Sequence, residues 1–202
     1  MKLVYGITVS TEQDEIKNLV SFIRKHTNDD IVVQYDSTKA STELLDDIRD
    51  YNVIYNAAIF SNNFADFKNE LNVFCESLGA DYVLQLDADE MISEFLINNI
   101  KPILESNSNV ELFLFPRINT VKGLTPKHIE QWGWNVNEKG WVNYPDFQGR
   151  LFKSKCRWRG KVHETIFSPE TYSFFPESDE YSIFHHKDIE RQVYQNSLYS
   201  RI

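Results

Sequence analysis

The apolar run YVLQL at residues 82–86 is followed immediately by the acidic stretch DADE at residues 87–90. The run has strand character, and open α/β sheets bind their ligands at the carboxyl ends of strands. At such a strand end, the turn allows Asp87 and Asp89 to reach one cation. Mg²⁺ and Mn²⁺ prefer carboxylate oxygens together with ligand phosphates. The stretch therefore predicts a metal site, with a solvated turn as the alternative because Asp is common where strands end.

Around this stretch, strand-like runs alternate with helical spacings through the first 115 residues. We expect strands at residues 3–9, 31–35, 53–55, 82–86 and 111–115, and helices at residues 16–23, 44–48, 64–78 and 95–104. Gly79 suits a left-handed cap at the end of the third helix. The repeated strand–helix–strand order predicts an α/β fold with a mostly parallel central sheet flanked by helices.

The second half of the chain has a different pattern. Residues 119–144 show no sustained periodicity, yet they contain Trp132, Trp134, Trp141 and Tyr144. Long loops inside compact domains are usually functional or mobile, so these rings are expected either to stack on a sugar or to pack beneath the loop. Short strands are expected at residues 148–152, 157–163 and 180–184, and a helix at residues 189–199. This half predicts a smaller mixed β region.

Composition limits the class of protein. The 202 residues, 42% of them hydrophobic, suit one domain with a full core. A net charge of −9 argues against a surface that attracts nucleic acid or anionic lipid as a whole. No run approaches the ~20 apolar residues that cross a bilayer, and the amino terminus lacks a signal-peptide core. Cys75 and Cys156 are expected to be buried thiols. We therefore expect a cytoplasmic protein.

One basic cluster stands out in this acidic chain. It comprises Arg150, Lys153, Lys155, Arg157, Arg159 and Lys161. Alternation along strands would place several of these side chains on one face. The cluster is interpreted either as a charged edge strand that prevents aggregation or as a surface that faces a polyanion. The polyanion would be a phosphate-bearing glycan or a nucleic acid whose hydroxylated base is flipped out.

The order of several short segments resembles family 2 glycosyltransferases with the GT-A fold, in a non-processive branch that carries an Asp-x-Asp motif. The segments are ITV at 7–9, Asp36 at the end of the second strand, FADFKNE at 64–70, LDADE at 86–90, DFQGRLF at 146–152, WRGKVHE at 158–164 and HHK at 185–187. Lys68 departs from the family, where an Arg is usual. Asp36 is followed by Ser37-Thr38 in place of the customary Asp-Gly, and the chain is short for a separate acceptor domain.

The resemblance implies a single glycosyltransferase domain over residues 1–202. Residues 1–116 would bind the nucleotide-sugar, most simply a UDP-sugar, and residues 117–202 would form the acceptor and catalytic half. The implied contacts to the nucleotide-sugar are Thr8, Asp36, Lys68, Asp87 and Arg150. The implied cofactor is Mn²⁺ or Mg²⁺, held by Asp89 with His185 or His186, where it would neutralise the departing diphosphate.

Inverting transfer also requires a base that takes the proton of the acceptor hydroxyl. Glu164 and Asp146 are the candidates, and we favour Glu164 because it follows an apolar-flanked segment near the expected site. Either carboxylate could instead be a structural partner of the nearby arginines.

Two other functions remain open from the sequence. A nucleotidyltransferase would want a Gly-rich or basic phosphate loop after the first strand, and STEQ at residues 10–13 does not provide one. A non-catalytic module would use its carboxylates to hold a cation and its basic cluster to bind nucleic acid. For a transferase, the expected acceptor is a glycan or lipopolysaccharide-type sugar, with a hydroxylated base in nucleic acid as the alternative.

Overall fold

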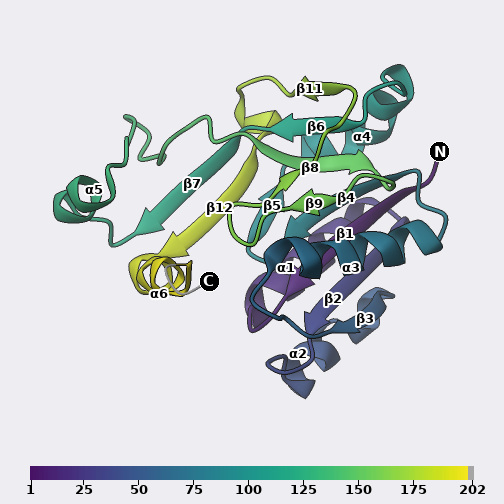
Figure 1. Ribbon diagram of the computed structural model, residues 1–202, viewed down its shortest axis with the longest axis horizontal. Coiled ribbons are helices and arrows are strands. Elements are labelled where there is room, and N and C mark those ends of the chain that lie inside the picture. The colour runs from purple at the N-terminus through teal and green to yellow at the C-terminus, as the bar shows by residue number, and fades with distance from the viewer. Residues whose placement is uncertain (200–202) are drawn as a thin grey trace.

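The computed structural model describes residues 1–199 and is built on a seven-stranded sheet (Figure 1). The strand order is β11-β6-β8-β4-β1-β2-β3. The strands are β1 (Leu3–Val9), β2 (Asp30–Asp36), β3 (Ile54–Ala58), β4 (Tyr82–Asp87), β6 (Leu112–Phe115), β8 (Gln148–Lys153) and β11 (Tyr172–Phe174). Strands β4, β1, β2 and β3 are parallel, whereas β8 runs antiparallel to both β4 and β6. The carboxyl ends of β1, β2 and β4 therefore meet at one edge.

Helices cover both faces of this sheet because β1 is apolar on both of its sides. Leu3, Tyr5 and Ile7 pack in one core cluster with α1 (Gln13–His26) and α4 (Glu94–Ser106). Val4 packs in a second cluster with α3 (Phe64–Ser77). A Cβ atom on Gly6 would lie 3.2 Å from the Leu71 side chain, so glycine allows α3 to approach β1 closely. The short helix α2 (Thr42–Asp47) follows β2.

A smaller mixed sheet lies beside the main one and completes the C-terminal half. It pairs β5 (Glu90–Ile92) and β7 (Arg117–Lys122) with the strand between them, β12 (Ile183–Asp188). Strands β9 (Trp158–Arg159) and β10 (Thr165–Ile166) form a separate hairpin. Helix α5 (Pro126–Trp132) projects away from the sheets in Figure 1, and α6 (Ile189–Tyr199) follows β12.

The expected α/β architecture, with its mostly parallel sheet and smaller mixed region, is confirmed. Gly79 takes the predicted left-handed conformation with φ of 81°, and both cysteines are buried and free. The strand expected over residues 157–163 is wrong, because only β9 is extended there and Gly160 turns the chain with φ of 107°. Residues 119–144 contain the end of β7 and helix α5, which showed no periodicity because α5 buries no residue. No helix among residues 1–199 is long and apolar enough to cross a membrane.

Candidate active site

The candidate site lies where β1, β2 and β4 end. Thr8 pairs with Asp87 in the parallel register of β1 and β4, and the Thr8 hydroxyl donates a hydrogen bond of 2.9 Å to Asp87 Oδ1. Asp36 is the last residue of β2. These are the strand ends at which the YVLQLDADE stretch predicted a ligand site.

Two buried cations hold Asp87. Lys68 Nζ on α3 lies 3.0 Å from Asp87 Oδ1, and Arg150 Nη2 on β8 lies 2.9 Å from Oδ2. The side chains of Lys68 and Arg150 are both only 4% exposed. Burial alone would raise the pKa of Asp87, but these two cations lower that pKa well below its ordinary value. Asp87 is therefore ionised, and it gathers two positive charges at the end of β4.

These contacts belong to a longer series of ion pairs. Lys68 also pairs with Glu164 at 2.8 Å, Arg150 pairs with Glu90 at 2.8 Å, Glu90 pairs with Arg117 at 3.2 Å, and Arg117 pairs with Asp146 at 2.7 Å. We call the series Glu164–Lys68–Asp87–Arg150–Glu90–Arg117–Asp146 the charge chain. The two candidate bases, Glu164 and Asp146, therefore stand at opposite ends of the charge chain and are not direct partners of each other within it.

A second cluster surrounds Asp89. His185 Nε2 lies 3.2 Å from Asp89 Oδ2, Arg191 Nη2 lies 3.3 Å from it and Lys187 Nζ lies 4.0 Å from it. The other ring nitrogen of His185 lies 2.9 Å from Asn119 Oδ1. Burial would raise the pKa of Asp89, but His185 and Lys187 hold that pKa well below its ordinary value. Burial lowers the pKa of His185, which favours the neutral imidazole that a metal ion requires.

Asp89 and His185 have the spacing of two neighbouring ligands of one metal ion. Adjacent ligands of an octahedral ion bound at about 2.1 Å stand about 3 Å apart, which matches the 3.2 Å between Asp89 Oδ2 and His185 Nε2. Among residues 1–199 there is no group of three or more acidic, histidine or cysteine side chains able to hold a metal. His186 points elsewhere on β12: it is exposed, and its Nδ1 pairs with Thr120.

Asp36 carries a buried oxygen that accepts no hydrogen bond among the described residues. The residue is 1% exposed, and its Oδ1 accepts hydrogen bonds from the Thr38 amide at 3.1 Å and the Thr38 hydroxyl at 2.7 Å. Among the described residues Oδ2 has no hydrogen-bond partner, with Lys39 Nζ at 3.6 Å. Such an acceptor is costly to leave unpaired. It is suited to accept a hydrogen bond from a ligand at the end of β2.

The two candidate bases differ in how fully they are bound. Asp146 Oδ2 accepts from Arg117 Nε at 3.0 Å and from Asn119 at 2.8 Å, and its Oδ1 accepts from Gln148 at 2.8 Å. Burial would raise the pKa of Asp146, but Arg117 together with the hydrogen bonds from Asn119 and Gln148 lowers that pKa overall. Glu164 is 14% exposed at its side chain and is paired through Oε1 with Lys68. Asp146 is thus bound through both of its oxygens, although its side chain is the more exposed of the two at 29%.

The basic cluster at residues 150–161 does not form one face. Arg150 is inside the site, Lys155 pairs with Glu111 at 2.8 Å and Arg157 pairs with Glu76. Strand β8 ends at Lys153 and β9 is two residues long, so alternation does not continue through the cluster. Arg159 and Lys161 are exposed.

Helix α6 contributes residues that sequence reasoning did not place in the site. Besides reaching Asp89, Arg191 pairs with Glu12 at 2.9 Å and Glu15 at 2.8 Å at the start of α1. The Tyr199 ring lies 5.6 Å from the His163 ring. Burial raises the pKa of the Tyr199 hydroxyl to about 12. Sequence reasoning also missed three site residues, Glu90, Arg117 and Trp158. Only Glu90 could have been found from its neighbours, because it directly follows the Asp-x-Asp motif.

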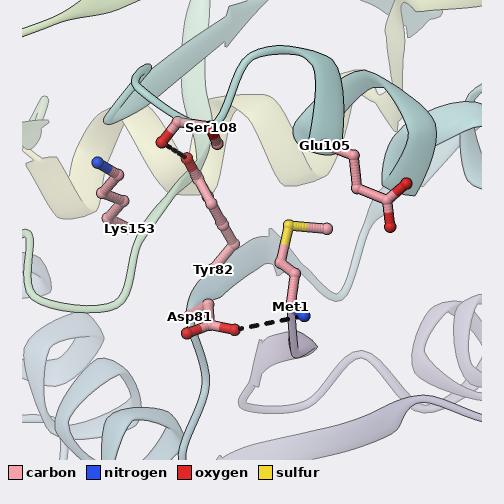
Figure 2. Close-up of a pocket in the computed structure, with 6 residues that line it drawn as sticks. All are labelled: Met1, Asp81, Tyr82, Glu105, Ser108 and Lys153. Atoms are coloured by element: carbon pink, nitrogen blue, oxygen red, sulfur yellow. Dashed lines mark hydrogen bonds and ion pairs between the residues drawn. The ribbon is translucent and has the colours of Figure 1, made fainter.

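A surface hollow lies at the opposite end of β4 (Figure 2). Its volume is about 430 Å³, and it is lined by Met1, Asp81, Tyr82, Glu105, Ser108 and Lys153. Figure 2 shows the Tyr82 hydroxyl bonded to Ser108 and the Asp81 carboxylate facing the amino group of Met1. No residue of the charge chain lines this hollow, so it is separate from the candidate site.

Known structures share this fold, although no family model and no curated protein sequence matches the chain. S. aureus TarS 1-349 in complex with UDP-GlcNAc superimposes with a TM-score of 0.61 at 13% identity, over 93% of this chain and 59% of that one. A second structure, of S. aureus TarS, gives a TM-score of 0.60 at 12% identity, over 92% of this chain and 37% of that one. The chain thus spans less than two thirds of these proteins. Its fold is of the GT-A type, as the sequence resemblance implied.

Proposed function

We propose that this protein is a glycosyltransferase that moves a sugar from a UDP-sugar to a hydroxyl group of a carbohydrate acceptor, with inversion. One observation carries the proposal. In a fold shared with a protein solved with UDP-GlcNAc, the ends of β1, β2 and β4 bring together the unpaired oxygen of Asp36, the cations on Asp87 and the Asp89–His185 pair. These groups match the nucleoside and the diphosphate of one ligand.

The donor contacts are assigned by chemistry. Asp36 accepts from the uracil or the ribose, which would satisfy its unpaired oxygen. Lys68 and Arg150, fixed by Asp87, supply positive charge for the diphosphate. Thr8 helps to fix Asp87. A Mn²⁺ or Mg²⁺ ion held by Asp89 and His185 would stabilise the negative charge of the leaving diphosphate.

Transfer is a single displacement. The acceptor oxygen forms a bond to the anomeric carbon while the bond from that carbon to the diphosphate oxygen breaks, which inverts the configuration. Glu164 takes the hydroxyl proton. Asp146, whose two oxygens are occupied, holds Arg117 and Asn119 in place. The scattered basic cluster offers no continuous track for a phosphate backbone, so we favour a carbohydrate acceptor over nucleic acid.

The test is a panel of UDP- and GDP-sugars with Mn²⁺, with Mg²⁺ and with EDTA. Thermal stabilisation by UDP that requires the metal, together with metal-dependent release of UDP from one sugar nucleotide, is the expected result. Asp89→Asn should lose both responses. Binding of UDP without turnover of any donor would favour a non-catalytic module, and nucleoside triphosphate consumption would favour a nucleotidyltransferase.

A further inference from the structure

Lys68 lies on the face of a buried tryptophan. Its Nζ is 4.9 Å from the centre of the Trp158 ring, and Arg150 Cζ is 5.8 Å from the same ring. Trp158 is 4% exposed. One aromatic ring therefore lies near both cations that hold Asp87, in a desolvated place where the attraction between a cation and a ring is strongest.

Trp158 is itself held in place through both its backbone and its indole ring. Asn69, which follows Lys68 on α3, accepts from the Trp158 amide at 2.7 Å and donates to the Trp158 carbonyl at 2.9 Å. The indole Nε1 donates to Gln85 on β4 at 2.8 Å. The Phe152 ring meets the indole edge-on at 5.6 Å. Trp158 is thus fixed relative to α3 and β4, the two elements that carry Lys68 and Asp87.

We propose that Trp158 is a positioning residue that holds the Lys68 ammonium between Asp87 and Glu164 through the face of its indole ring. A lysine side chain has four flexible carbons and a compact charge, so two carboxylates alone do not fix its direction. The ring closes the side of the ammonium that faces the core. For its effect on donor binding, this inference rests on the proposed function, in which Lys68 meets the diphosphate.

A matched pair of variants separates the ring from the rest of the residue. Trp158→Phe and Trp158→Met both remove the bond to Gln85 and both lose volume, but only phenylalanine keeps an aromatic face. Methionine adapts to irregular space, which favours a folded variant. Phe152→Leu is the control for a loosened core, because Phe152 contacts the indole and is fully buried.

The first readout is the affinity for UDP compared with that for uridine. Trp158→Met should weaken UDP binding about tenfold, the size of one charge-assisted hydrogen bond, with uridine affinity little changed. Trp158→Phe and Phe152→Leu should stay close to wild type for both ligands. Equal losses in Trp158→Met and Trp158→Phe, or equal losses for UDP and uridine, would overturn the inference and leave Trp158 a packing residue.

The second readout does not depend on any ligand. The Lys68 ammonium should give a slowly exchanging ¹H–¹⁵N signal, assigned by its loss in Lys68→Met. The signal should persist in Trp158→Phe and Phe152→Leu and disappear in Trp158→Met. If wild type does not bind UDP, the proposed function falls, and this signal alone decides the role of Trp158. Persistence of the signal in Trp158→Met contradicts that role.

Discussion

Lys68 Nζ lies 2.8 Å from Glu164 Oε1, so the favoured base is paired with a cation that also holds the donor-side carboxylate Asp87. The end of β4 and the loop after β9 are thereby joined through a single ammonium group. Substitutions at Glu164 that cannot accept a hydrogen bond from Lys68 are expected to report on this connection as well as on proton transfer.

Glu164→Gln should lower turnover by about a hundredfold or more, because glutamine keeps shape and hydrogen-bonding reach but cannot take the proton. The affinity for UDP should stay nearly unchanged. Steady-state kinetics with UDP titrations provide the measurement. Asp146→Asn is the comparison, and it should act mainly on acceptor affinity and stability. If Asp146→Asn abolished turnover while Glu164→Gln retained it, the role of base would pass to Asp146.

His185→Ala and His186→Ala form a matched test of the metal ligand. His185 contacts Asp89, whereas His186 is exposed and pairs with Thr120. His185→Ala should weaken metal-dependent UDP binding at least tenfold, because losing even a residue that only orients a metal ligand typically costs about tenfold or more. His186→Ala should change it by no more than about twofold. Calorimetric titration of UDP in the presence of Mn²⁺ distinguishes the two variants. Similar losses of affinity in both would contradict the assignment of His185 as the metal ligand.

Arg191→Leu should tighten the binding of UDP with Mn²⁺, because the guanidinium lies 3.3 Å from Asp89 Oδ2 and competes with an incoming cation. We expect the UDP affinity to rise about two- to fivefold, the range of a partly exposed charge pair. The free protein should melt lower, since Arg191 also pairs with Glu12 and Glu15. Gln192→Ala, on the same helix, is the control. Weaker UDP binding in Arg191→Leu would instead make Arg191 a donor contact.

The stability of the protein should fall in acid partly through Asp146. Burial would raise its folded pKa, but Arg117 and the hydrogen bonds from Asn119 and Gln148 together outweigh burial and lower that pKa below 3.8. A lowered folded pKa contributes stability that is fully present above the unfolded pKa and is lost as pH falls through the folded pKa. Asp146→Asn should therefore cost about 1–2 kcal/mol at neutral pH. Urea denaturation should show this difference shrinking below about pH 4. A constant difference would exclude the carboxylate's charge as the cause.

Local patterns predicted the parts of the site that lie on single elements. The apolar run of β4 predicted where Asp87 and Asp89 stand, at the carboxyl end of a strand. Thr8 and Asp36 came from the family resemblance, and the parallel pairing of β1 with β2 and β4 brings them to the same sheet edge. These predictions succeed because the period of a strand and the position of its end are set by neighbouring residues.

Contacts between distant segments could not be predicted in this way. The choice of His185 over His186 follows from the register in which His185 pairs with Glu90 across β12 and β5. Arg191 reaches Asp89 only because β12 delivers α6 to the site. The basic cluster was predicted to share one face, but the end of β8 at Lys153 separates its members. Register and strand ends of this kind depend on tertiary pairing.

The charge chain limits how this sequence can change in evolution. Each inner member neutralises two neighbours, as Asp87 does for Lys68 and Arg150. Loss of one member leaves a buried charge uncompensated, whereas loss of two adjacent opposite charges leaves the balance intact. Substitutions along the charge chain should therefore be non-additive. The double variant with Lys68→Met and Glu164→Gln should lose less free energy of unfolding than the two single variants lose in sum. Homologues with neither lysine nor arginine at the position of Lys68 are expected to have changed at Glu164 or Asp87 as well.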